Sequence, residues 1–243
     1  MYYQLYQQQV NRVLEAIFQN EGAAIERAGA LLADSLEQDG LLFVFGCGHS
    51  HILAEELFYR AGGLAAVYPI FETAAMLHEG AAKSSQVERM SGYAKHVIAR
   101  YPVSDKDCML VVSTSGINPF PMEMAQGARD RGAKVIGISS FEYRGRPSRR
   151  EDGKHLPDFC DICIDNHVPA GDASVEICAD GTMAGPVSTI ASVAIANSIA
   201  LTACEKLRGQ GIEPRVFKSG NCPGTDEHNA AILRDFLPRI RHL

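Results

Sequence analysis

The 243-residue sequence lacks the basic excess of a protein that binds nucleic acid through its phosphates. It has 23 lysine and arginine residues against 29 aspartate and glutamate residues, so its formal net charge is −6. Non-specific nucleic-acid affinity comes from many lysine and arginine contacts with phosphates, so we expect no nucleic-acid partner. A small anionic metabolite stays compatible with an acidic chain, because a few backbone amides directed at one point can bind it.

The sequence also lacks a secretory leader and a good membrane span. Residues 1–20 are polar and rich in glutamine, without the apolar centre of a signal peptide. The seven cysteines are odd in number and scattered, which favours free thiols in the cytoplasm. The uncharged run 181–204 contains a proline, an asparagine and several hydroxyl residues, which is typical of a buried core helix. We therefore expect no membrane contact.

No low-complexity tract interrupts the chain, and 46% of its residues are hydrophobic, enough for a substantial core. The apolar runs 41–45 and 108–112 predict strands that are buried on both faces, as in a parallel sheet covered by helices. Further strands are predicted at 65–70, 134–139 and 161–165, and helices at 3–19, 21–38, 50–61, 87–100, 119–131, 183–208 and 226–237.

This alternation predicts an α/β fold, a three-layer α-β-α sandwich around a mainly parallel sheet. We expect one domain over residues 1–243. It would comprise an N-terminal helical pair (1–38), the α/β core (39–208) and a C-terminal tail (209–243).

Two polar loops follow the two long apolar strands. Gly46-Cys47-Gly48-His49-Ser50 comes after the first, and Ser113-Thr114-Ser115-Gly116 after the second, followed by Asn118. Glycines allow a sharp turn close to an anion, and a helix that starts there offers free N–H groups. Each loop alone is also compatible with ordinary turn chemistry. Because ligands bind at the carboxyl ends of strands in open α/β sheets, the pair predicts an anion site.

The glycine loop is not a dinucleotide fingerprint. His51 stands where that pattern requires a third glycine, which serves close packing of helix on strand. Because this glycine is missing, NAD binding is disfavoured. Glu72, after the strand 65–70, remains a possible substitute for the acid that binds a ribose.

The two loops together resemble the SIS family of phosphosugar isomerases and phosphosugar-binding domains, and the resemblance spans nearly the whole chain. The resemblance to phosphoheptose isomerase is the strongest, whereas residues 171–176 and 219–229 look like an uncharacterised subgroup of the SIS family. It implies a flavodoxin-like doubly wound fold, a phosphosugar ligand, and a homodimer or homotetramer with the site near the subunit interface. The predicted phosphate-binding residues are Gly46, Gly48, His49, Ser50, His51, Ser113, Thr114, Ser115 and Asn118.

Aldose–ketose isomerisation moves a proton between adjacent carbons and so needs a positioned base. The resemblance assigns this role to Glu56, although the segment between the two loops is shorter here, and Glu55 is its neighbour. Glu176 and His228 are further candidates, with an exposed strand-end carboxylate and a solvated helix cap as their structural alternatives.

A required cofactor is not predicted, but a divalent metal such as zinc is an alternative. His51 and Glu55 are spaced i, i+4 on one helix face, as metal ligands can be. Phosphoheptose isomerase has a further histidine in the last core helix. Helix 183–208 has none, so a third ligand would come from elsewhere, such as His228. Cys160 and Cys163 enter a strand and are expected on opposite faces, which disfavours a joint site.

Three functions stay open at this stage. The first is a phosphosugar isomerase acting through an enediol. The second is a lyase similar to N-acetylmuramate-6-phosphate etherase, which also begins with proton abstraction beside a carbonyl. The third is a non-catalytic phosphosugar sensor.

Overall fold

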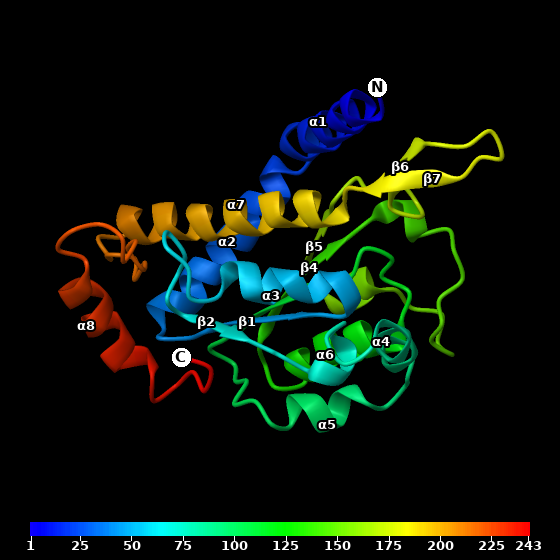
Figure 1. The fold of residues 1–243 in the computed structure, drawn as a ribbon. Coiled ribbons are helices and arrows are strands. Elements are labelled where there is room, and N and C mark those ends of the chain that lie inside the picture. Colours follow the sequence, from blue (N-terminus) through cyan, green and yellow to red (C-terminus); the bar gives the residue numbers. More distant parts are fainter.

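A parallel sheet of five strands forms the centre of the computed structural model, which describes all 243 residues. The strands are β1 (Leu42–Gly46), β2 (Val67–Pro69), β3 (Cys108–Val112), β4 (Lys134–Ser139) and β5 (Ile162–Asp165). Their order across the sheet is β2-β1-β3-β4-β5 (Figure 1). This is the flavodoxin-like doubly wound order, so the predicted fold class is confirmed.

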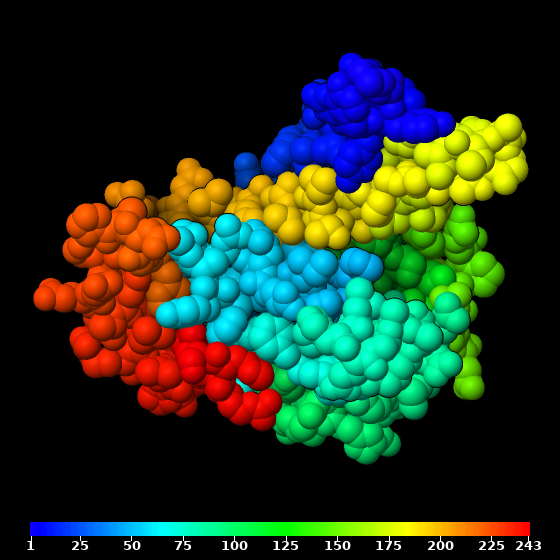
Figure 2. All heavy atoms as spheres, viewed as in Figure 1, coloured from blue at the N-terminus to red at the C-terminus, as the bar shows by residue number.

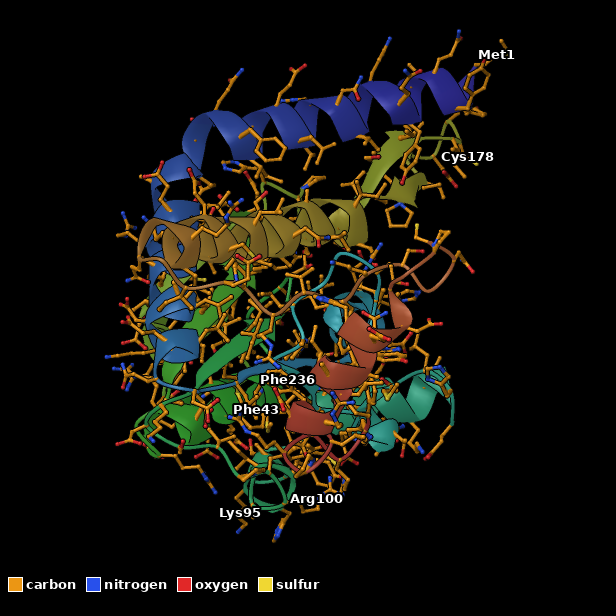
Figure 3. The ribbon with its side chains drawn as sticks, turned by 90° about the vertical axis from the view of Figure 1, so that its left-hand side faces the viewer. Met1, Phe43, Lys95, Arg100, Cys178 and Phe236 are labelled. Carbon is orange, nitrogen blue, oxygen red and sulfur yellow. The ribbon has the colours of Figure 1, made fainter.

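Helices cover both faces of the sheet, and alternate residues of each strand point to opposite cores. Leu42 and Val44 pack in one core, beneath α1 (Tyr2–Asn20), α2 (Gly22–Glu37), α3 (Ile52–Leu57) and α7 (Ser188–Gly209). Phe43 and Phe45 pack in the other, which α4 (Ala81–Glu88), α5 (Ala94–Ile98), α6 (Pro119–Arg129) and α8 (Asp226–Phe236) complete. Figure 3 shows Phe236 of α8 turned inward on the side of Phe43.

Helix α7 accounts for the apolar run that resembles a membrane span. It is long and apolar enough to cross a membrane, yet it lies along α2 as part of the core (Figure 1). The approach is close, because a Cβ added to Gly29 of α2 would lie 2.5 Å from Cβ of Thr202. The prediction of a core helix packed through small residues is confirmed for the face on α2, whereas the opposite face is exposed, with Leu201 68% exposed.

Two predicted helices differ from the structure. The segment 87–100 contains only the end of α4 and the whole of α5. The chain breaks between them because Gly92 adopts a positive φ of +81° and its N–H donates to the carboxylate of Glu123. Helix 50–61 is replaced by a 3₁₀ turn, Gly48–His51, followed by α3, which ends at Leu57.

A hairpin that the sequence did not predict precedes α7. β6 (Ala173–Glu176) pairs with β7 (Met183–Pro186) in antiparallel fashion, so the predicted helix 183–208 begins only at Ser188. The carboxylate of Asp172 accepts hydrogen bonds from the N–H groups of Val187 and Ser188, at 3.0 and 2.8 Å. These bonds fix the start of α7, because a helix leaves its first N–H groups without internal partners.

The expectation that Cys160 and Cys163 point to opposite faces is wrong. A Cβ added to Gly137 would lie 2.6 Å from Sγ of Cys160 and 3.0 Å from Sγ of Cys163, so both sulfurs lie over the same glycine. Strand alternation does not apply here, since Cys160 comes before β5 begins. All seven cysteines are free thiols.

Candidate functional site

The carboxyl ends of β1 and β3 lie side by side at one edge of the sheet. The strands pair in parallel, and Gly46 lies opposite Val112 at the end of the ladder. The chain passes from β1 to β2 on one side, and from β3 to β4 on the other. Open α/β sheets bind ligands at such a switch point. The two polar loops therefore adjoin, as the sequence predicts.

The glycine loop turns back tightly on itself. A Cβ on Gly46 would lie 2.4 Å from the carbonyl oxygen of Ser50, so no other residue permits this approach. The N–H of Ser50 donates to the carbonyl of Cys47 at 3.0 Å, and Gly48 adopts a positive φ of +55°. This turn holds the Ser50 side chain at the sheet edge, beside the end of β3.

The second loop is fixed by an internal hydrogen bond and by one glycine. The N–H of Gly116 donates to Oγ of Ser113 at 3.3 Å. Gly116 has a φ of +61°, and a Cβ there would lie 2.7 Å from Oγ of Ser139. Ser113 is buried, whereas Thr114 and Ser115 are only partly buried and so remain open to a ligand.

A narrow crevice connects both loops with the first turn of α7. Hydroxyl side chains dominate its lining, which consists of His49, Ser50, Leu53, Val112, Thr114, Ser188, Thr189 and Ser192. The first N–H groups of this 22-residue helix and the hydroxyl of Ser188 already donate to the carboxylate of Asp172, which leaves Thr189 as the free hydroxyl of this turn. The cavity measures about 10 Å³. That is roughly the space of one water molecule, so a phosphate monoester would sit at the mouth of the crevice rather than inside it.

Figure 1 shows the first turns of α3 and α7 at the same end of the molecule, beside α4. The contribution of α7 was missed because the sequence predicts a helix that starts at residue 183, which would place Ser188 and Thr189 inside it. Only the hairpin β6–β7 brings these two hydroxyl residues to the first turn.

Two larger cavities lie away from this edge. One, of about 290 Å³, lies between the end of α3 and α7 and has a mainly apolar lining that includes Leu57 and Leu201. The other, of about 500 Å³, lies at the tail beside Phe236 and Arg239. Neither is at the carboxyl edge of the sheet, where the polar loops converge.

Three potential metal ligands meet beside the glycine loop. Ligand atoms of His51, Glu55 and His78 all lie within 4.8 Å of one another. Nε2 of the buried His51 is 3.2 Å from Oε1 of Glu55, and its ring packs edge-on against His78 at a centroid distance of 5.3 Å. Nδ1 of His51 is hydrogen-bonded to the carbonyl of Gly48. A backbone carbonyl on the far nitrogen is the usual support of a metal-binding histidine.

These three residues fit a zinc site by donor type, because zinc takes histidine nitrogen and carboxylate oxygen. The third donor is His78, which comes from an irregular segment whose position the sequence does not reveal. His228 instead bonds to the carbonyl of Val216 at 2.8 Å. It belongs to the first turn of α8, at the opposite end of the molecule from the loops (Figure 1).

The glutamates predicted for acid–base work lie in different surroundings. Glu56 forms an ion pair with Arg60 and accepts a hydrogen bond from Asn197 at 3.3 Å, so it faces α7. Glu55 pairs with His51. Glu176 is exposed on the hairpin β6–β7, which projects from the molecule (Figure 1).

A glutamate that the sequence did not single out lies at the second loop. The side-chain amide of the buried Asn118 donates to Oε1 of Glu88 at 2.5 Å, and its carbonyl accepts from the guanidinium of Arg149 at 2.6 Å. Burial raises the pKa of Glu88, while the bond from Asn118 and the charges of Arg89 and Arg149 oppose the rise. Glu88 belongs to α4, in the segment that the sequence predicts as a continuous helix.

The buried Glu72, after β2, is already engaged. It forms an ion pair with Arg100 and accepts a hydrogen bond from the hydroxyl of Tyr93 at 2.9 Å. It therefore has the partners of a structural carboxylate, rather than those of a ribose-binding acid.

Comparison of the sequence with curated proteins finds close relatives along almost the entire chain. A UPF0309 protein of Listeria innocua is 46% identical over 230 residues, which are 94% of this chain and 93% of that protein. A UPF0309 protein of Halalkalibacterium halodurans is 39% identical over 236 residues, 97% of this chain and 94% of that protein.

Solved structures share the fold at lower identity. A phosphoheptose isomerase from Francisella tularensis superposes with a TM-score of 0.53 at 19% identity, over 82% of this chain and 95% of that one. The Vibrio vulnificus NanR protein complexed with ManNAc-6P superposes with a TM-score of 0.52 at 12% identity, over 98% of this chain and 69% of that one. The family model of the SIS domain matches residues 5–140, and the chain belongs to the SIS domain family.

Proposed function

We propose that this protein binds a sugar phosphate at the junction of β1, β3 and α7 and isomerises it between aldose and ketose. The observation that carries the proposal is the convergence of Ser50, Thr114 and Thr189 from three separate elements on one crevice. Hydroxyl groups, backbone amides and a helix N-terminus are what binds a phosphate monoester without many basic residues. The phosphosugar class is supported by the names of the structural neighbours and by the family.

The reaction requires only the transfer of protons. A base removes the proton from the carbon beside the carbonyl, an enediol forms, and the proton returns to the neighbouring carbon. No carboxylate lines the crevice itself, so the base has to come from a neighbouring element at the same edge of the sheet. A cytoplasmic location fits this chemistry and the seven free thiols.

The experiment incubates the purified protein in D₂O with a panel of aldose and ketose phosphates and follows deuterium at C1 and C2 by NMR. We expect incorporation with at least one substrate, and binding of the same substrate by calorimetry. Binding without exchange would leave a phosphosugar sensor and contradict the isomerase. Release of lactate from the amino-sugar lactyl ether would instead show the etherase reaction.

The proposal includes a divalent metal, with His51, Glu55 and His78 as its ligands. A bound zinc ion would polarise a carbonyl oxygen as a Lewis acid. In its absence, the His51 ring is already oriented by the Gly48 carbonyl, and Nε2 points to Glu55.

Zinc binding is tested with a chromophoric chelator and by thermal unfolding. We expect Zn²⁺ to raise the melting temperature of the parent protein, and His78→Ala to abolish the shift, because two protein donors hold zinc much more weakly than three. The exposed His96 on α5 provides a control, His96→Ala, which should retain the shift. An equal shift in His78→Ala would remove His78 from the site.

A further inference from the structure

The base for the proposed reaction has to be a carboxylate that faces both loops and keeps an oxygen free. Glu88 is the last residue of α4, and α4 packs against the 3₁₀ turn Gly48–His51 as well as α6. On the side of the second loop, Asn118 holds its Oε1. On the side of the first loop lies the buried Cys47, whose thiol pKa is raised by burial and then by the charges of Glu88 and Glu72.

The second oxygen of Glu88 is available to a ligand. Oε2 accepts no hydrogen bond from the protein, and it is not among the buried polar atoms without a partner, so it reaches the surface. Two other glutamates nearby are each held by an arginine and by a second hydrogen-bond donor. Glu56 is held by Arg60 and Asn197, and Glu72 by Arg100 and Tyr93.

Asn118 acts as a bridge that sets the orientation of Glu88. Its carbonyl oxygen accepts from the Arg149 guanidinium, so its NH₂ group has to face the carboxylate. Arg149 is itself fixed, because its backbone N–H donates to the carbonyl of Ile117 at 2.9 Å. The arginine-rich loop 141–159 thus reaches the site through one residue, Arg149.

From this juxtaposition we propose that Glu88 is the acid–base residue of the site, and that Asn118 and Arg149 are its positioning residues. The inference rests on the proposed function. Oε2 of Glu88 takes the proton from C2 of the aldose phosphate, and the electron pair of the broken C–H bond forms the C1=C2 bond of the enediol. Glu88 then returns the proton to C1, while the proton of the 2-hydroxyl passes to the C1 oxygen through water, so no redox agent is consumed.

The central test replaces the carboxylate with an amide of the same shape. Glu88→Gln should lower deuterium exchange by about 10²- to 10⁴-fold, the usual contribution of general acid–base catalysis, and leave calorimetric binding within about threefold. Glu88→Asp, which keeps the charge but shortens the reach, should also lose exchange at least about tenfold by the same logic of geometry. Glu142→Gln, an exposed glutamate in the loop 141–159, serves as the matched control.

The positioning role has a separate readout in the pH profile. A base must be deprotonated, so kcat/KM falls as pH drops through the Glu88 pKa. The charged groups that act on Glu88 are Arg89, which follows directly after the end of α4, and Arg149 on the loop, and both lower that pKa. Arg149→Met should therefore move the acidic limb to higher pH, and Arg149→Lys should restore part of the shift. Arg146→Met, which removes an exposed arginine of the same loop, should not move it.

The outcomes separate the two proposals. If the parent protein exchanges no deuterium, the isomerase fails and the role of Glu88 fails with it. If the parent exchanges and Glu88→Gln exchanges at a comparable rate, only the role of Glu88 is overturned. Loss of binding in a folded Glu88→Gln variant would also overturn it, because the residue would then be a ligand contact.

Discussion

At the residue scale, single glycines decide whether the two loops can lie where they do. Gly46 permits the backbone of residues 46–50 to fold back against Ser50, and Gly116 combines a positive φ with contact to Ser139. Both residues stand in loops that the sequence already marks as anion-binding. The same two loops therefore need glycine for their backbone conformation and are the ones predicted to bind the anion.

Gly116→Ala should destabilise the protein by about 1–3 kcal/mol, because a Cβ is strained at positive φ and would crowd Oγ of Ser139. Urea unfolding measures the change, and Gly145→Ala, with no atom within 4 Å of the added Cβ, is the control. Equal stability of the two variants would show that the loop relaxes without cost.

Thr114 tests the phosphate site with one hydroxyl group. Thr114→Val keeps the shape of the side chain, so it should weaken sugar-phosphate binding by about 10-fold or more, as expected for one hydrogen bond to a charged group. Calorimetry provides the measurement. The control Thr182→Val removes a hydroxyl from the exposed hairpin end instead. Unchanged affinity of Thr114→Val would take this side chain out of the site.

At the scale of elements, the close crossing of α2 and α7 sets the position of the first turn of α7. Alanine is a better helix former than glycine, so propensity alone would favour Gly→Ala in both helices. Gly29 lies against Thr202, whereas Gly209, the last residue of α7, has no atom within 4 Å of an added Cβ.

Gly29→Ala should therefore destabilise the protein by about 1–3 kcal/mol through overpacking, even though it removes an unfavourable residue from a helix. Gly209→Ala should be neutral or slightly stabilising. Thermal unfolding of both variants compares the two. A gain of stability in Gly29→Ala would mean that α2 and α7 are not in the close contact described.

The strands and most helices could be predicted from the sequence because their patterns are local. The runs 41–45 and 108–112 are apolar throughout, and the glycines and hydroxyl residues behind them mark the loops. The hairpin β6–β7 could not be predicted in this way, since Ala173–Glu176 and Met183–Pro186 are short and partly exposed, and the second contains a glycine. The break between α4 and α5 depends on Gly92 and the distant Glu123.

Some residues of the candidate site could likewise be predicted from local patterns, and others could not. Adjacent loops follow from the parallel order of β1 and β3, and the structure confirms that they adjoin. His78 comes from an irregular segment after β2, where no periodicity indicates which side chains turn to the sheet edge. Glu88 falls within the predicted helix 87–100, but the pattern does not indicate that its side chain meets the second loop. Their importance emerges only once Asn118, Arg149 and His51 are placed around them.

At the scale of the whole molecule, α1 exposes apolar side chains away from the core. The helix projects from the body of the protein, and Figure 2 shows it standing above the surface of α3 and α7. Its exposed apolar side chains include Tyr3, Leu5 and Phe18. The hairpin tip lies against its start, since the hydroxyl of Tyr2 donates to the carbonyl of Ile177, and Figure 3 shows Cys178 close to Met1.

We therefore propose a homodimer formed through α1. Light scattering should give about twice the chain mass of 26.3 kDa for the parent protein. The double variant Leu5→Lys/Phe18→Lys should be monomeric, because charges buried in an apolar interface are costly. The control Gln210→Lys adds charge at an exposed polar position after the end of α7 and should remain dimeric. A monomeric parent would contradict the dimer.

The crystal structure of the protein with a bound sugar phosphate is the most direct measurement. We expect the phosphoryl oxygens within hydrogen-bond distance of the hydroxyls of Ser50 and Thr114, and the sugar carbons directed toward Glu88. A phosphoryl group bound at any other place on the molecule would contradict the proposed site.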